Sequence, residues 1–224
     1  MRYSTLCSIL TFGYSSTANI INLGRAQSYG LVSGSKGITN VGLTVVTGNL
    51  GTTANTVSGF APGVVTGGVQ NIGNMAAARA FDDGQVAYAN AKNLGPDTDI
   101  STLNDLTGKT IYPGIYFAAR TITLTGQLFL DARGDSSATW VFQSGSALLI
   151  NLGSSIILTN GAKASNVFWQ TGSAATIAVG AAFQGNILAY AGIAVKTGAS
   201  VNGSLIALTE SITLQSNDIV AQKN

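Results

Sequence analysis

A strand-like pattern occurs four times in the C-terminal half of the chain. The four copies are Trp140–Ser146, Val167–Ser173, Asn186–Gly192 and Ser204–Glu210. Each copy is followed by a run in which apolar and polar residues alternate, and then by a short corner that contains Gly or Asn. Strand patterns that repeat at a period of about 18 to 27 residues are typical of stacked solenoid coils. The sequence therefore predicts a mainly β fold, a parallel β-solenoid, rather than a catalytic α/β domain.

The composition favours one folded unit with little charge on its surface. The chain has 224 residues, of which 46% are hydrophobic, so it can bury a sizeable core. Its 28 glycines, against three prolines, suit many tight corners. Charged residues make up 9% of the chain, compared with about a quarter in an average protein. Thr, Ser, Asn, Gln, Ala and Gly must therefore cover most of the surface.

Several classes of function are disfavoured by the same composition. The net charge of +2 is spread without basic clusters, and the chain has no histidine, the commonest general base and metal ligand. A polysaccharide-cleaving solenoid needs paired carboxylates in one groove. Asp82 and Asp83 instead fall in a predicted helix, and Asp131–Asp135 reads as a turn with a local salt bridge. We expect no enzyme activity, nucleic acid, metal or cofactor; a structural or adhesive module stays open as an alternative.

The N-terminal 22 residues differ from the rest of the chain. Arg2 precedes a short apolar run, and the stretch Tyr14–Ala18 consists mostly of small residues. Residues 1–22 thus resemble a secretory signal, with an ordinary N-terminal extension as the alternative. Cys7 is the single cysteine, and no later run approaches the roughly 18 apolar residues of a membrane span. We expect a secreted protein without a membrane span, whose folded domain covers residues 23–224.

One long helix is predicted over residues 72–93. Phe81 and Tyr88 lie seven residues apart on one face, and the small residues Ala77, Ala78 and Gly84 share that face. Such a face can approach a sheet closely. Gly95 and Pro96 end the helix.

From Ile111 onward the chain divides into five coils of three strands. The first strand of each coil is apolar at successive positions, which implies burial on both sides. We therefore expect the helix to cover the outer side of these first strands. Short strand patterns also occur nearer the N-terminus, over residues 29–32, 38–41 and 43–46.

The second strand of each coil alternates between apolar and small or polar residues. By period two, the inward residues are Ile122, Leu124, Leu148, Ile150, Ala175, Ile177, Val179, Ile193, Val195, Ile212 and Leu214. The outward residues are Thr121, Thr123, Thr125, Ala147, Leu149, Asn151, Thr176, Ala178, Ala194, Lys196, Ser211, Thr213 and Gln215. Because stacked strands lie about 4.8 Å apart, these side chains should form a broad, flat and nearly uncharged surface.

Motifs in the same order along the chain resemble the microbial ice-binding proteins of the DUF3494 family. The motifs include Leu23–Ala26, Thr47–Thr52, Tyr112–Tyr116, Leu124–Ala132, Asn166–Gln170 and Lys196–Gly203. This resemblance runs from about Leu23 to Ala221. It implies a right-handed, three-faced β-solenoid with a helix alongside. It also implies a discontinuous coil order, in which the N-terminal coil docks on the last C-terminal coil.

The resemblance further implies that the second-strand face binds ice. The expected ice-binding residues are the outward set named above without Lys196, together with Thr39. The expected partners are an ice surface and ordered water, and the protein is expected to be a monomer.

Some relatives carry a regular Thr pattern on this face, whereas Leu149, Ala194 and Lys196 interrupt it here. We therefore expect moderate thermal hysteresis with clear inhibition of ice recrystallisation. Lys196 reads as a solvated charge or a limit to the flat area, and Leu149 as an ice contact or a protein contact.

Overall fold

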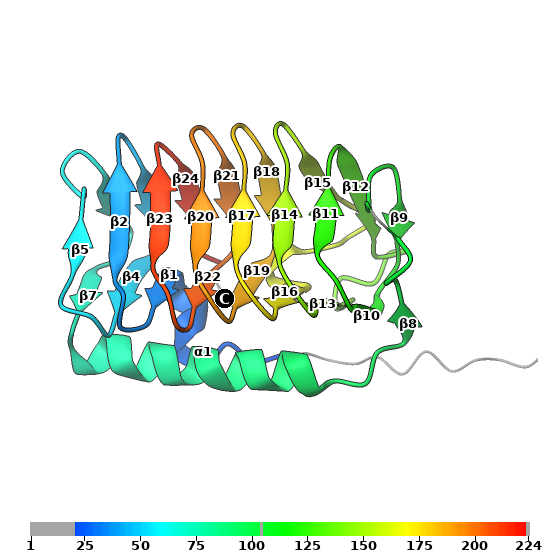
Figure 1. Ribbon diagram of the computed structural model, residues 1–224, viewed down its shortest axis with the longest axis horizontal. Coiled ribbons are helices and arrows are strands. Elements are labelled where there is room, and N and C mark those ends of the chain that lie inside the picture. Colours follow the sequence, from blue (N-terminus) through cyan, green and yellow to red (C-terminus); the bar gives the residue numbers. More distant parts are fainter. Residues whose placement is uncertain (1–20, 104, 223–224) are drawn as a thin grey trace, which may run out of the picture.

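Three parallel sheets form the walls of a solenoid, and one helix lies beside them (Figure 1). The computed structural model describes residues 21–103 and 105–222. Most of the expected secretory signal, residues 1–20, lies outside this range. Ile21 and Asn22 lie inside it, and Ile21 is buried in the cluster beneath the helix. The described part of the folded body therefore begins at least two residues before the expected boundary at 23.

Each sheet collects strands from successive coils. Sheet A has nine strands in the order β7 (Gln70–Ile72), β4 (Asn49–Thr52), β1 (Tyr29–Ser33), β22 (Leu205–Ala207), β19 (Asn186–Ala189), β16 (Val167–Thr171), β13 (Trp140–Ser144), β10 (Gly114–Ala118) and β8 (Thr98–Asp99). Sheet B has seven, in the order β11 (Ile122–Leu124), β14 (Leu148–Ile150), β17 (Ala175–Ile177), β20 (Ile193–Val195), β23 (Ile212–Gln215), β2 (Ile38–Val41) and β5 (Val57–Ser58). Sheet C has eight, in the order β6 (Val64–Thr66), β3 (Val45–Thr47), β24 (Asp218–Val220), β21 (Ser200–Asn202), β18 (Ala182–Gln184), β15 (Ser155–Thr159), β12 (Gln127–Asp131) and β9 (Thr110–Ile111). The sequence thus predicted the five C-terminal coils and their sheets correctly.

The coil order is discontinuous, as the family resemblance implied. Strands β1, β2 and β3 pair in parallel with β22, β23 and β24, the strands of the last coil. The helix then carries the chain along the solenoid to its far end, where β8 begins (Figure 1). As a result, sheet B gains β2 and β5 beyond the five second strands that the repeat predicts.

Helix α1 (Met75–Asn93) covers the outer side of sheet A, as expected. It begins later than predicted, because Gln70–Ile72 forms β7 and the side chain of Asn74 caps the helix by accepting the Ala77 N–H at 2.9 Å. Gly84 allows close approach, since a Cβ there would lie 2.9 Å from Cγ2 of Ile206. At the other end, the Gln143 amide donates to the carbonyls of Ala91 and Leu94 at 2.7 and 2.8 Å.

An aromatic ladder fills part of the space between the three sheets. The rings of Phe142 and Trp169 stack with centroids 4.0 Å apart, and Tyr116 and Phe183 extend the ladder on either side. Stacked aromatic pairs contribute about 0.5–1.5 kcal/mol beyond their area burial. The parallel sheets are therefore held on a continuous, well-packed core.

The structure corrects several local predictions. Val179 was expected to point inward, but it lies just beyond β17 at a corner and is 45% exposed. Leu43 was expected in a strand, but β3 begins at Val45 and Leu43 is exposed. Strands β5 to β9 were missed, because they lie before or at the start of the repeated coil pattern that identifies the other short strands. The turn at Asp131–Asp135 is confirmed, since Arg133 has φ 52° and its N–H donates to the Asp131 carboxylate at 2.8 Å.

Two further properties of the described residues bear on function. None of their helices is both long and apolar enough to cross a membrane. No group of three or more His, Cys, Asp or Glu side chains in this part of the chain could hold a metal ion.

Candidate functional site

Sheet B faces the viewer in Figure 1, and α1 lies along its lower margin without crossing it. Its inward side chains are buried, as the alternation predicted. They are Ile122, Leu124, Leu148, Ile150, Ala175, Ile177, Ile193, Val195, Ile212 and Leu214. The alternate positions point away from the core, so their side chains form three outward rows across the strands.

The central row runs across all seven strands in register. It consists of Thr123, Leu149, Thr176, Ala194, Thr213, Thr39 and Ser58. Neighbouring strands are about 4.8 Å apart, so the row is about 29 Å long. The sequence predicted every member except Ser58. Ser58 was missed because β5 has two residues and lies in a Gly/Thr/Pro-rich segment without a strand pattern.

The hydroxyl groups of this row are available to water. Within the part of the chain that the structure describes, the side chains of Thr39, Thr123, Thr176 and Thr213 make no hydrogen bond to protein. Each presents a hydroxyl and a methyl group on a rigid strand. A Thr hydroxyl can donate one hydrogen bond and accept two, so each can hold ordered water.

The row nearer to α1, called the lower row, carries only short side chains. Its members are Thr121, Ala147, Ala174, Gly192, Ser211, Gly37 and Thr56. Backbone ladder bonds continue through this row, as between Ile122 N–H and the Ala147 carbonyl at 3.0 Å. The sequence predicted Thr121, Ala147 and Ser211 here. It missed Ala174 and Gly192, which precede the clearly alternating positions, and Gly37 and Thr56 in the N-terminal coils.

The upper row, next to sheet C, has longer and more polar side chains. It contains Thr125, Asn151, Ala178, Lys196, Gln215 and Val41. Lys196 provides a cation in the middle of this row. Val41 is exposed at the opposite end from Thr125. The row therefore differs in chemistry from the other two, although all three belong to the same sheet.

Thr125 differs from the other predicted threonines because its hydroxyl donates to the carboxylate of Asp105. The same carboxylate accepts the N–H of Thr107 at 2.9 Å and that of Thr125 at 3.2 Å. Burial acts to raise the pKa of Asp105, but the hydrogen bonds from Thr125 and Thr107 outweigh it and lower the pKa below its usual value. An acid from outside the sheet therefore lies beside one end of this face, and Thr125 is engaged in holding that end of the solenoid.

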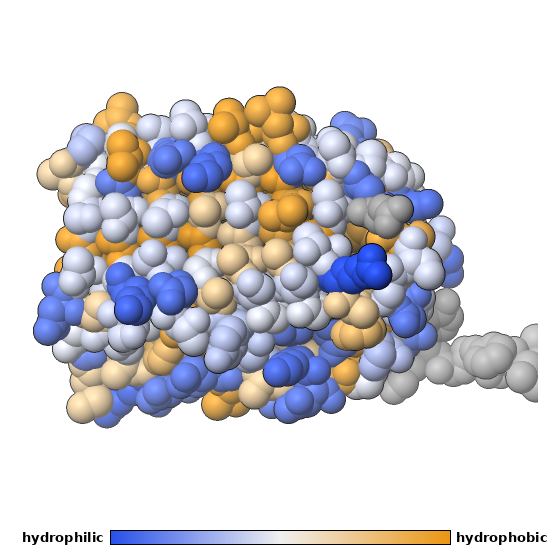
Figure 2. All heavy atoms as spheres, in the orientation of Figure 1, coloured by the Kyte–Doolittle hydropathy of each residue, from blue (hydrophilic) through white to orange (hydrophobic). Residues whose placement is uncertain are grey.

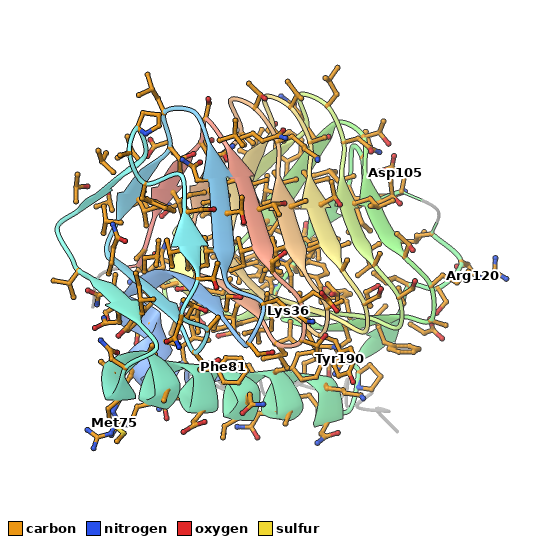
Figure 3. All side chains as sticks on the ribbon, turned by 60° about the vertical axis from the view of Figure 1, so that its left-hand side comes forward. Lys36, Met75, Phe81, Asp105, Arg120 and Tyr190 are labelled. Carbon is orange, nitrogen blue, oxygen red and sulfur yellow. The ribbon has the colours of Figure 1, made fainter. Side chains whose placement is uncertain are left out.

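The middle of sheet B is pale to tan with orange patches in Figure 2, and blue groups lie above and below it. Lys36 and Arg120 lie near opposite ends of the corner between sheets A and B, and Asp105 lies at the edge of sheet B (Figure 3). The central and lower rows contain no charged residue. Together the two rows form a flat, uncharged surface that can adsorb to a partner of matching geometry.

The fold and this open sheet define a class of protein: a three-sheet parallel β-solenoid with one sheet covered by a helix and another left flat and exposed. The family profile described as "Ice-binding-like" matches residues 32–220, and the chain belongs to this family. This finding agrees with the resemblance seen in the sequence motifs.

Individual relatives agree with the family match. An ice-binding protein of Nostoc sp. (strain HG1) is 38% identical, with 97% of this chain and 82% of the relative covered. An ice-binding protein of Flavobacterium frigoris (strain PS1) is 34% identical, with 91% and 77% covered. The crystal structure of an ice-binding protein from the Antarctic ascomycete Antarctomyces psychrotrophicus superimposes with a TM-score of 0.88. It is 39% identical, with 91% of this chain and 99% of that chain covered.

Proposed function

We propose that this protein adsorbs to ice through sheet B and has no enzymatic turnover. The observation that carries the proposal is the central row, in which uncharged side chains, most of them bearing hydroxyls, run in register across seven strands. The names of the relatives, all ice-binding proteins, support the same conclusion.

Adsorption depends on geometry because ice offers only water to recognise. The methyl groups of the threonines disfavour disordered solvent, while their hydroxyls hold waters at fixed spacings that can join the lattice. Bridging waters can hold an interface nearly as well as direct hydrogen bonds, and a preorganised platform loses little entropy on binding. Charges would oppose adsorption, since each keeps its own hydration shell. Their absence from the central and lower rows fits this mechanism.

Adsorbed protein blocks growth of the ice front between the bound molecules. The front then curves, and further growth requires a lower temperature. The expected results are moderate thermal hysteresis and inhibition of recrystallisation, because Leu149 and Ala194 interrupt the row of hydroxyls.

We further propose secretion and a monomeric state in solution, on the pattern of residues 1–22 and on a binding mode that needs one copy. Ice-affinity partition tests function and processing together. Protein expressed with its own N-terminus is offered to a slowly growing ice hemisphere, and the retained species is analysed by mass spectrometry. Retention above that of a non-binding protein of similar size supports ice binding, and exclusion into the liquid overturns it. Removal of residues near 22 supports secretion, and light scattering of the same sample measures the oligomeric state.

A further inference from the structure

The three outward rows of sheet B differ in charge and in side-chain length. The central and lower rows contain only Thr, Ser, Ala, Gly and Leu149. The upper row contains Lys196, Gln215 and Asn151, and its first hydroxyl, that of Thr125, is occupied by Asp105. If the whole sheet met ice, an ammonium group would have to give up hydration near the centre of the contact.

We propose that ice contacts only the central and lower rows, and that Lys196 sets the upper limit of the contact area. This inference rests on the proposed function. The contact band is defined by the central row, Thr123 to Ser58, and the lower row, Thr121 to Thr56. It spans all seven strands, about 29 Å in length, but only two rows in width.

Hydration provides the physical reason for this limit. A lysine ammonium is a compact and strongly hydrated charge, and transfer of a charge away from water is costly unless it is paired. Among the described residues the one salt bridge joins Arg25 to Asp83, and neither residue belongs to sheet B. Lys196 has no such partner within that part of the chain, so its best stabilisation comes from liquid water. Water around it resists the fixed arrangement of the lattice.

The lower boundary of the band is also charged. Arg120 directly precedes Thr121, Glu210 precedes Ser211, and Lys36 precedes Gly37. These three side chains are exposed at the corner between sheets A and B. In Figure 2 this band is pale to tan with orange patches, and scattered blue groups lie above and below it. The band is therefore bounded on both long sides by groups that favour liquid water.

Two alanines on either side of Thr176 offer a matched test. Ala174 is in the lower row and Ala178 in the upper row; both are partly exposed, and they immediately precede and follow β17. Ala174→Lys places a charge inside the band, whereas Ala178→Lys places one beside the existing Lys196. We expect Ala174→Lys to lose most of its thermal hysteresis and Ala178→Lys to keep most of it. Lys196→Thr should raise thermal hysteresis, because it opens the upper row to the lattice.

The measurements are thermal hysteresis against protein concentration, with the melting temperature of each variant as the folding control. The variant Thr176→Tyr separates the two proposals, since the central row belongs to both. Equal losses for Ala174→Lys and Ala178→Lys, with Thr176→Tyr inactive, would overturn the two-row band but leave ice binding by sheet B standing. Unchanged activity in Lys196→Thr would overturn the role of Lys196. If Thr176→Tyr keeps full activity, the proposed function of sheet B itself fails.

Discussion

Sheets B and C are built from the same coils, yet their outward side chains are used differently. On sheet C, Asn202 donates to the side chain of Gln184 at 3.0 Å and accepts from Gln222, and the hydroxyls of Thr47 and Thr66 lie 3.2 Å apart. The polar groups of sheet C thus bond to one another along the solenoid. The central threonines of sheet B leave their hydroxyls to solvent.

This difference shows that a flat parallel sheet is not by itself an adsorption surface. Both sheets have the same strand spacing and few charges, so spacing alone cannot distinguish them. The outward residues of sheet C also include the charged Asp218 and two bulky, half-buried apolar side chains, Phe129 and Ile157. A surface suited to ice needs regular spacing, short side chains and polar groups without internal partners.

The largest expected effect comes from placing one bulky ring on each sheet. Thr176→Tyr lifts the central row of sheet B away from a flat partner, so thermal hysteresis should be nearly lost. Ser155→Tyr, on β15 of sheet C, should leave it nearly unchanged. Both positions are at the surface, where substitutions usually change the free energy of unfolding by no more than about 0.5 kcal/mol. Equal loss of thermal hysteresis in the two variants, at unchanged melting temperatures, would mean that sheet B is not the distinguishing surface.

A smaller effect is expected from removing one hydroxyl while keeping the shape of the side chain. Thr176→Val keeps the methyl group and the flat surface but cannot hold a water by hydrogen bonds. We expect a partial loss of thermal hysteresis, clearly less than in Thr176→Tyr. The matched control on sheet C is Thr47→Val, which removes one partner of a hydroxyl pair and should not alter thermal hysteresis. An equal response to both valines would contradict the importance of free hydroxyls.

The sequence predicted much of sheet B because its signal is local. Alternation in Leu148–Ile150 or Ile212–Gln215 gives the side of the sheet on which each residue lies. The position of the helix also followed from Phe81, Tyr88 and the small residues around them. The discontinuous coil order came from family resemblance, since nothing in the residues of β2 alone specifies that it pairs with β23.

The missed features depend on contacts between segments distant in sequence. Ser58 joins the central row only because β5 pairs with β2, which in turn pairs with β23. Asp105 meets Thr125 because the segment before β9 stacks on the end of sheet B. Val179 follows the alternation but lies two residues past the strand, where a corner turns it outward. Period alone does not reveal where a short strand stops.

Acid should affect the end of sheet B in a modest and measurable way. The pKa of Asp105 is lowered in the folded state, so its stabilising effect is present above its unfolded pKa and disappears as pH falls through the folded pKa. Asp105→Asn should lower the melting temperature at neutral pH. The loss in free energy of unfolding should be no more than about 1 kcal/mol, because the Asp105 carboxylate is near solvent. Below the folded pKa of Asp105 the variant and the parent should converge. Thermal melts from pH 7 to pH 2 measure this, and a difference that persists at the lowest pH would contradict it.

The smallest effect on thermal hysteresis is expected from breaking the side-chain ladder of sheet C. Asn202→Ala removes its hydrogen bonds to Gln184 and Gln222, and hydrogen bonds of this kind contribute about 0.5–1.5 kcal/mol each. The melting temperature should therefore fall slightly, whereas thermal hysteresis measured well below that temperature should stay the same. Chemical denaturation and thermal hysteresis on one sample separate the two quantities. A marked loss of thermal hysteresis without a loss of stability would show that sheet C takes part in adsorption and that its hydrogen-bonded side chains are part of the ice-binding surface.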